Sequence, residues 1–406
     1  MINHAAVAAQ FPFLTEADGP AIAYLDSGAT AQKPQVVLDA LNNHLARHNA
    51  NVHRGVYPLA AESDVLFEGA RERIAKRVGR QPEETVFGKN ATELVNLVAR
   101  SWGGANVGEG DLIVTTVMEH HANIVPWQML RDSTGCELGW VEVDEEGRLD
   151  MGSLDALLAR GPKLVAVTHV SNVLGTINPV LEIAEKVHAA GALLLVDGCQ
   201  AAPQMDIREA VQAADFYVVT GHKIYGPTGI GVLFARRELL AAMPPFLGGG
   251  DMIRTVSREK ATWNDLPFKF EAGTPAYTEA TALAVAWDWL EDLGFDDVRA
   301  HEQELVERTL AELEAMGGIT VFGPKDAESR GALVTFAVDG VHPHDVAEIL
   351  GRSGVCVRAG HHCAGPLMDH LGVSSTTRAS FAVHNSDEDV DRLIAALGEV
   401  RRIFGD

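Results

Sequence analysis

The stretch FYVVTGHKIYGPTGIG, residues 216–231, joins a short apolar run to a polar turn that is rich in glycine. The run at 216–219 predicts a buried strand, and Lys223 follows it with Thr220 and His222 close by. An amine held at such a strand end can condense with an aldehyde, which is how enzymes carry pyridoxal phosphate as a Schiff base. On its own, this segment also fits a solvated loop lysine.

Other apolar runs predict further strands of the same sheet. They lie at 112–117, 164–168, 193–196 and 232–234, and a helical pattern of apolar residues at 180–188 separates two of them. Continuous apolar strands separated by helices are typical of a parallel sheet that is covered on both faces. We therefore expect an α/β protein.

A change in the pattern of predicted helices and strands near Gly294 indicates a second domain. A long helical pattern at 278–293 ends there, and shorter helices and strands alternate in the remaining residues. We expect a large domain at 24–293 and a smaller α+β domain formed by 1–23 and 294–406.

Composition limits the possible partners and the compartment. The 406 residues carry a formal net charge of -23, which argues against nucleic acid or an anionic membrane as a partner. The four cysteines, Cys136, Cys199, Cys356 and Cys363, form no Cys-x-x-Cys pair, which suggests a reducing compartment. The first ten residues do not resemble a signal peptide, and no apolar run is long enough to span a bilayer. A cytoplasmic location is expected.

Polar side chains follow the predicted strands at the point where each strand ends. They include His121, Asn172, Asp197 with Gln200, and Lys223. Because ligands of open parallel sheets bind outside the carboxyl ends of the strands, we expect these side chains to form one site.

Each of these residues suits pyridoxal phosphate, and each has an ordinary alternative. Asp197 could pair with the protonated pyridine nitrogen, or it could be a helix N-cap. His121 could stack on the ring and move protons, or it could be a hydrogen-bonded core histidine. Gln200 and Asn172 could donate to the ring hydroxyl and to a substrate carboxylate.

A phosphate group needs backbone amides and hydroxyls at the start of a helix. Ala91 and Thr92 open an apolar helical pattern, and Thr220 and His222 would be further donors. No glycine-rich dinucleotide fingerprint follows the first strand, which disfavours an NAD-dependent oxidoreductase.

Residues 357–366, VRAGHHCAGP, predict a mobile loop with Cys363 between glycines. Arg358, His361 and His362 could stabilise the thiolate of this cysteine, which is its nucleophilic form. The alternative is a metal site on His361, His362 and Cys363, although no second pair of ligands with zinc-finger spacing accompanies them. We expect no metal.

Nearly the whole chain resembles the SUF-type (group II) cysteine desulfurases and selenocysteine lyases, in the class V branch of the fold-type I pyridoxal-phosphate enzymes. The motif at 360–363 is specific to this group. The other matching segments are 24–26, 29–30, 32–34, 51–55, 118–128, 170–180, 197–200, 220–233, 248–250, 272–275, 358–366 and 378–381.

The resemblance implies a homodimer with the fold-type I architecture, in which a mainly parallel seven-stranded-type sheet forms the large domain. It implies that Lys223 carries the cofactor, that Cys363 becomes a persulfide, and that Arg378 with Asn172 and Arg358 binds the substrate. It also implies contacts to the ring from His121, Asp197 and Gln200, and to the phosphate from Ala91, Thr92, Thr220 and His222. Thr274 is similar to a residue that reaches the phosphate of the neighbouring subunit.

We therefore interpret the chain as a cysteine desulfurase that converts L-cysteine to L-alanine and passes sulfur to a SUF-type acceptor protein for iron–sulfur cluster assembly. A selenocysteine lyase acting on L-selenocysteine is the alternative within the fold. A zinc-dependent sulfur-binding scaffold that uses His361, His362 and Cys363 is the alternative from another class.

Overall fold

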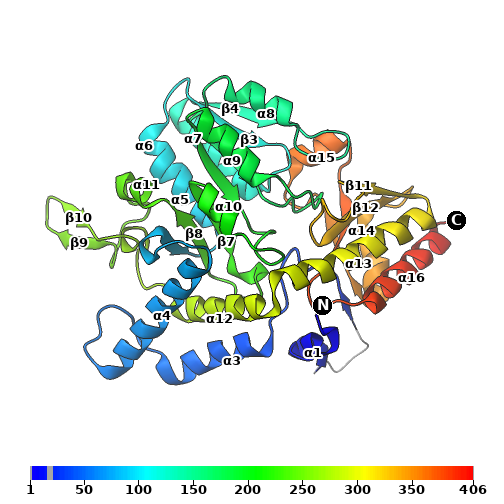
Figure 1. Cartoon of the computed structure of the whole chain (residues 1–406), viewed down its shortest axis with the longest axis horizontal. Coiled ribbons are helices and arrows are strands. Elements are labelled where there is room, and N and C mark those ends of the chain that lie inside the picture. Colours follow the sequence, from blue (N-terminus) through cyan, green and yellow to red (C-terminus); the bar gives the residue numbers. More distant parts are fainter. Residues whose placement is uncertain (1, 16–21, 406) are drawn as a thin grey trace.

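A computed structural model describes residues 2–15 and 22–405 of the chain. Its centre is a seven-stranded sheet, which a smaller antiparallel sheet adjoins on the side of the C-terminus (Figure 1). In spatial order, the strands of the large sheet are β2 (Thr85–Gly88), β8 (Gly231–Ala235), β7 (Phe216–Thr220), β6 (Leu193–Asp197), β5 (Leu164–Thr168), β3 (Leu112–Thr116) and β4 (Glu137–Val141).

The large sheet is mainly parallel, as the apolar runs predicted. Only β8 runs against its neighbours, since it pairs antiparallel with both β7 and β2. The connection from β7 to β8 is the glycine turn after Lys223, which is too short for a crossover helix and so reverses the chain. The fold class expected from the sequence is confirmed.

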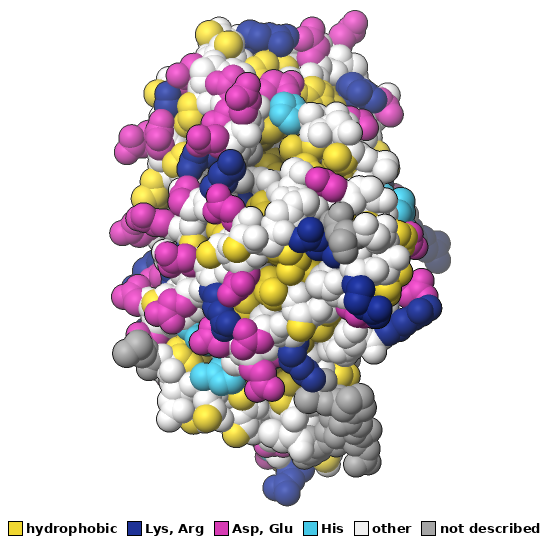
Figure 2. Space-filling view, turned by 90° about the vertical axis from the view of Figure 1, so that its right-hand side faces the viewer, with side chains coloured by type: hydrophobic (Ala, Val, Ile, Leu, Met, Phe, Trp, Pro, Cys, Tyr) yellow, Lys and Arg dark blue, Asp and Glu magenta, His cyan; other side chains and the backbone are white. Residues whose placement is uncertain are grey.

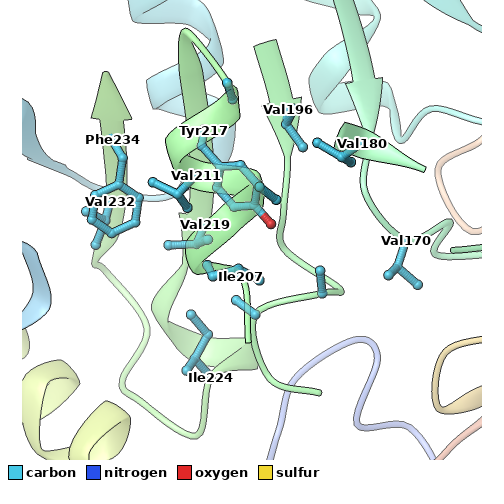
Figure 3. Close-up of a cluster of buried hydrophobic side chains, with 14 of the residues drawn as sticks. Val170, Val180, Val196, Ile207, Val211, Tyr217, Val219, Ile224, Val232 and Phe234 are labelled. Carbon is cyan, nitrogen blue, oxygen red and sulfur yellow. The ribbon is translucent and has the colours of Figure 1, made fainter. Parts of the chain in front are cut away.

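Alternate residues of each central strand pack into different cores on the two faces of the sheet. Tyr217 and Val219 join one core, while Phe216 and Val218 join the other. Figure 3 shows Tyr217 and Val219 in the first core, close to Ile207 and Val211. Helices α8 (Met151–Leu158), α9 (Val180–Ala189) and α10 (Arg208–Ala213) cover that face, and α5 (Ala91–Leu97), α7 (Val125–Thr134) and α11 (Arg237–Ala242) cover the other.

Three more helices pack together beside the first core. They are α3 (Gln35–Asn43), α4 (Pro58–Arg77) and α12 (Tyr277–Leu293), which lie below the sheet in Figure 1. The side chains of α12 are almost all buried over its first fourteen residues, so this helix belongs to the interior of the large part. The other described elements of this part are α1 (His4–Ala8), α2 (Pro12–Thr15), α6 (Gly104–Asn106) and the hairpin of β9 (Ile253–Val256) and β10 (Ala261–Trp263).

The smaller part has its own sheet and core. Its strands run in the order β11 (Ile319–Phe322), β12 (Leu333–Val338), β15 (Thr376–Ser380) and β14 (Arg358–Gly360), all antiparallel. Near them, β1 (Ala23–Tyr24) pairs parallel with β13 (Val355–Cys356), which brings the chain after the N-terminal helices to this part. The helices are α13 (Phe295–Met316), α14 (Pro343–Arg352), α15 (Gly365–Leu371) and α16 (Asp387–Phe404).

Helix α13 joins the two cores. Its first turns place Val298 in the core of the large sheet, and Leu305 and Leu313 lie in the core of the smaller one. The N-terminal segment also contributes to both cores, since Phe11 packs in the core of the large sheet and Leu25 in that of the smaller one.

The surface is dominated by acidic groups, as the net charge requires. Carboxylate side chains are spread over the face in Figure 2, with hydrophobic side chains visible between them. In the described part of the chain, no helix combines the length and the apolar character that crossing a membrane would need.

A buried ion pair ties α4 to the segment before α12. The Arg71 guanidinium is fully buried and donates to both carboxylate oxygens of Glu271, at 2.6 and 2.8 Å. Glu271 also accepts the backbone N–H of Phe87 in β2, and the Arg71 guanidinium lies 4.5 Å from the centre of the Phe87 ring. Glu68 accepts a third hydrogen bond from Arg71.

Glu271→Ala should lower the free energy of unfolding by about 3–5 kcal/mol, because it leaves a buried guanidinium without its main counter-charge. Urea unfolding measures this change. Glu137→Ala is the matched control, since its partner Arg160 is exposed and such pairs contribute little. Equal effects of the two substitutions would contradict the prediction.

Candidate active site

The carboxyl ends of the central parallel strands open into one cavity of about 300 Å³. Asp197 ends β6, Lys223 follows β7, Asn172 follows β5, and His120 follows β3. Parallel strands end at the same edge of their sheet, so side chains that are far apart in the sequence meet there. From the smaller part of the molecule, Arg358, Cys363 and Arg378 complete the wall.

Lys223 is the last residue of a short 3₁₀ turn, Gly221–Lys223, which directly follows strand β7. The turn is tight because the N–H groups of both Ile224 and Gly226 donate to the carbonyl of Gly221. A Cβ at Gly221 would lie 2.7 Å from the Ile230 side chain, so this close turn requires glycine. Burial lowers the pKa of Lys223, which favours the neutral, nucleophilic amine.

Asp197 is 5% exposed and faces the cavity. Its Oδ1 accepts the backbone N–H of Cys199 at 3.0 Å, and no α-helix begins at this position. The contact therefore fixes the carboxylate at the edge of the sheet, where it can interact with a group inside the cavity. Gln200, three residues further along, also lines the cavity and donates from Nε2 to the carbonyl of Gly28 at 2.8 Å.

A second carboxyl group, Glu119, lies beneath the cavity and is fully buried. It accepts hydrogen bonds from Thr116 Oγ1, from Asn123 Nδ2 and from the backbone N–H of Thr168. These contacts tie the end of β3 to the end of β5. Burial outweighs them and raises the pKa of Glu119 to about 8, so this group is mainly protonated at neutral pH.

The structure places His120, rather than His121, on the wall of the cavity. His120 accepts the N–H of Ala122 through Nδ1 and so caps the turn that follows β3. Burial, and next the charge of Lys223, lowers the pKa of His120 to about 4. His121 is directed to the Cys363 loop instead, where its Nε2 accepts the N–H of Gly365 at 2.9 Å.

Four of the expected phosphate ligands lie together at one end of the cavity. Ala91 and Thr92 open α5, and Thr220 and His222 flank the end of β7. The hydroxyl oxygen of Thr220 is buried and has no hydrogen-bond partner among the described residues. The N-cap of α5, Asn90, also lines this end, although the sequence reasoning did not select it.

Two arginines lie opposite the lysine and share one carboxylate. Arg378 is 2% exposed, and it donates to the carbonyl of Asn172 at 2.8 Å and to Asp26 at 3.3 Å. Arg358 is half exposed and pairs with the same Asp26 at 2.9 Å. The Nε atom of Arg378 is buried without a partner among the described residues, and so is available to an anion.

Cys363 is exposed and lies on a strained loop between β14 and α15. Its N–H donates to His361 Nδ1, while the ring of His362 turns away and contacts Thr376 through Nε2. Burial lowers the pKa of His362 to about 3, so this ring is neutral and supplies no positive charge to the thiolate. The described residues contain no group of three or more His, Cys, Asp or Glu side chains that could hold a metal ion.

Thr274 does not reach this cavity. It lies on the surface in a second cavity, together with Lys89, Gly273 and residues of the α5 region. All the predicted site residues except His121 and Thr274 therefore line one cavity in this chain: Ala91, Thr92, Asn172, Asp197, Gln200, Thr220, His222, Lys223, Arg358, Cys363 and Arg378.

The missed residues had weak signals in the sequence. Two adjacent histidines follow β3, and only the direction of the turn decides which one faces the sheet edge. Gly28 and Ala29, which line the cavity from the N-terminal segment, lie far from every predicted strand end. Cys199 is buried and also lines the cavity.

Comparison with known proteins agrees with this geometry. The family model of the class-V aminotransferases matches residues 23–393. A probable cysteine desulfurase from Halobacterium salinarum is 48% identical and covers 99% of this chain and 98% of its own, and the cysteine desulfurase of Haloferax volcanii is 45% identical over 95% and 91%. The chain belongs to the class-V aminotransferase family.

Within that family the chain is similar to cysteine desulfurases of known structure. The apo enzyme from Thermococcus onnurineus NA1 superposes with a TM-score of 0.94 at 38% identity, and the S-sulfonic acid form of CsdA from Escherichia coli with 0.91 at 35%. Each comparison covers 99% of both chains. Pyridoxal phosphate is the cofactor of this family, and the cavity fits it, because Lys223, Asp197 and the unpartnered Thr220 hydroxyl face the same space.

The raised pKa of Glu119 predicts a change of stability with pH. The folded protein keeps this proton above the ordinary pKa of 4.5, whereas the unfolded chain releases it, so stability is lost as the pH rises towards 8. The difference in unfolding free energy between wild type and Glu119→Gln should therefore shift by up to about 1.4 kcal/mol per pH unit between pH 5 and 8, with the wild type losing stability. Urea unfolding at several pH values measures it, and a difference that is independent of pH would contradict the prediction.

Proposed function

We propose that this protein is a pyridoxal-phosphate-dependent cysteine desulfurase. It converts L-cysteine to L-alanine and leaves the sulfur as a persulfide on Cys363. The observation that carries the proposal is that an exposed cysteine and a lysine with a lowered pKa line the same cavity, beside a buried carboxylate. The similarity to named cysteine desulfurases over nearly the whole chain supports it.

Residues that lie at the ends of several strands would hold the cofactor. Lys223 would form the covalent link, Asp197 would pair with the ring nitrogen, and His120 would contact the ring, since all three line the cavity. Thr220 and His222 would bind the phosphate with the backbone of Ala91 and Thr92, and Gln200 would donate to the ring hydroxyl. When bound, pyridoxal phosphate withdraws electrons from the Cα of an attached amino acid.

The chain supplies the substrate contacts and the proton transfer. Arg378 binds the substrate carboxylate through Nε, which has no partner among the described residues, and Asn172 lies beside it. Because Arg358 and Arg378 share the single carboxylate of Asp26, one positive charge is left without a counter-charge from Asp26 and can attract the substrate carboxylate. Lys223 is released when the substrate amine takes its place, and its amine then takes the proton from Cα.

The sulfur step needs no external oxidant or reductant. The Cys363 thiolate attacks the substrate sulfur, an S–S bond forms, and the Cβ–S bond breaks. The electron pair of the broken bond stays with the substrate carbon, which takes up a proton, and alanine results. The balance is L-cysteine plus a cysteine thiol giving L-alanine plus a cysteine persulfide. Arg358 lines the same cavity as the sulfur of Cys363.

The persulfide then passes its outer sulfur to an acceptor protein of the SUF type for iron–sulfur cluster assembly. The exposure of Cys363 supports a transfer at the surface, because an acceptor thiol must reach it. All four cysteines are free thiols, which suits the reducing cytoplasm, the location that we propose.

Two other functions remain as outcomes of the test. A selenocysteine lyase would use the same cavity but release selenium without help from Cys363. A zinc scaffold would need His361, His362 and Cys363 to converge on one ion. In the structure His361 Nδ1 faces the N–H of Cys363 and His362 Nε2 faces Thr376, which does not favour that arrangement.

Cys363→Ala should keep the visible absorption of the lysine-linked cofactor but lose alanine formation from L-cysteine, and it should retain part of the activity on L-selenocysteine. Carbon–sulfur cleavage needs a thiolate acceptor, whereas selenium leaves more easily. Lys223→Ala is the companion variant, which should lose the absorption and both activities. Alanine is measured from each substrate. Full activity of Cys363→Ala on cysteine would exclude the mechanism.

We also propose that the active unit is a homodimer. The segment from residue 44 to 66 exposes apolar side chains, with Val56 fully exposed, Val65 72% exposed and Leu45 56% exposed. Val65 also lines a shallow hollow with Ala61 and Leu66, which His48 and Glu62 border. Such a surface fits a second copy of the chain. Thr274, exposed on the surface, would then face the phosphate of the neighbour.

Sedimentation should give twice the chain mass of 43.5 kDa. Val65→Asp should shift the protein towards the monomer, because it places a charge in the apolar contact, and should reduce alanine formation. Leu181→Asp, on an exposed position of α9, is the control and should remain dimeric. A fully active monomer at assay concentration would contradict the proposal.

A further inference from the structure

The loop that carries Cys363 has a strained backbone. His362 and Cys363 have φ angles of 51° and 56°. These values lie in the left-handed region of the backbone, which residues other than glycine, asparagine and aspartate rarely adopt. Two such residues in succession persist only when their surroundings hold them. The contacts that hold this loop therefore decide whether the sulfur of Cys363 is kept in position.

Several contacts come from residues near the loop itself. Asn172 Nδ2 donates to the carbonyl of His362 at 2.7 Å, and the His362 ring contacts Thr376. The N–H groups of Cys363 and Ala364 both bond to His361, one to Nδ1 and one to the carbonyl. These contacts fix the two ends of the strained pair but leave the carbonyl of Cys363 and the N–H of Gly365 to other partners.

His121 supplies both of the missing contacts. Its backbone N–H donates to the carbonyl of Cys363 at 2.7 Å, and its ring Nε2 accepts the N–H of Gly365 at 2.9 Å. Gly365 is the first residue of α15, where the backbone N–H has no partner within the helix. A Cβ at Gly365 would lie 3.4 Å from His121 Nε2, an ordinary contact distance, which shows how closely the ring approaches this residue.

We propose that His121 is a positioning residue that holds the Cys363 loop in its strained conformation, and that protonation of its ring releases the loop. The inference rests on the proposed function only for its catalytic consequence. Because Nε2 accepts the Gly365 N–H, the ring proton of the neutral imidazole lies on Nδ1. Protonation at Nε2 turns the acceptor into a donor that faces another donor.

The surroundings of the His121 ring favour its neutral form. The titratable groups that face it are His361, whose ring centre lies 5.7 Å away, His120 at 6.3 Å, and the thiol of Cys363 on the same loop. Burial, and then His361, lowers the pKa of His121. The neutral acceptor is therefore present at neutral pH, and the contact is lost only on acidification.

Hydrogen exchange tests the contact directly, because the amide of Gly365 is the group that donates to His121. Wild-type protein should protect this amide at pH 7 and lose protection on acidification, after correction for the intrinsic exchange rate. His121→Ala should remove the protection at both pH values. His121→Gln keeps an acceptor that does not titrate in this range, so protection should be retained and become independent of pH. His370→Ala, on α15 but directed to Glu142, is the control and should behave as wild type.

Activity measurements distinguish a positioning role of His121 from a general loss of folding. His121→Ala should keep the visible absorption of the lysine-linked cofactor and lose alanine formation from L-cysteine at least tenfold, while activity on L-selenocysteine falls much less. His121→Gln should restore most of the cysteine activity. Protection of Gly365 in His121→Ala equal to wild type would overturn the proposal, as would pH-dependent protection in His121→Gln. If wild type forms no alanine from cysteine, the proposed function fails, and the exchange data still decide the role of His121.

Discussion

The site depends on one geometric constraint, which is that the parallel strands of the large sheet all end at the same edge. Strands β3, β5, β6 and β7 are separated in the sequence by helices that return the chain to the opposite edge, so each strand delivers its next residues to the same place. Asp197 and Lys223 lie side by side for this reason. The antiparallel β8 turns back just after Lys223, and the glycines of that turn bring the lysine close to the strand from which it came.

Burial then sorts the polar groups of the site into charged and neutral ones. His120, His222 and His362 all have lowered pKa values, and Glu119 has a raised one, because the solvent that would stabilise their charged forms has been removed. Arg378 keeps a counter-charge in Asp26. The cavity consequently presents guanidinium groups that can bind an anion, together with imidazole rings that stay neutral at neutral pH.

The sequence predicted the central strands and the polar residues that follow them because both depend on local patterns, whereas Arg378 was expected only from the family resemblance. The apolar runs that became β3, β5, β6 and β7 are continuous, and the residues after them are polar. Other features depend on contacts between distant segments. Strand β4 (ELGWV) lies at the sheet edge with exposed positions, so its apolar signal is weak, and β2 is only four residues long. The Arg71–Glu271 pair joins residues 200 positions apart, which no local pattern could reveal. Which of His120 and His121 faces the cavity depends on the direction of the turn after β3. Contacts of each ring with its neighbours fix that direction.

Helix α13 connects the two parts of the molecule that form the walls of the cavity. It is one continuous helix of 22 residues, about 33 Å long, with its first turns in the core that includes Ile224, next to Lys223, and its later turns in the core that includes Ala379, next to Arg378. A hinge in its middle would break backbone hydrogen bonds next to the buried Glu302. The helix thus links the wall that carries Lys223 to the wall that carries Arg378, so a change in their spacing would require the helix to bend or one of the cores to repack.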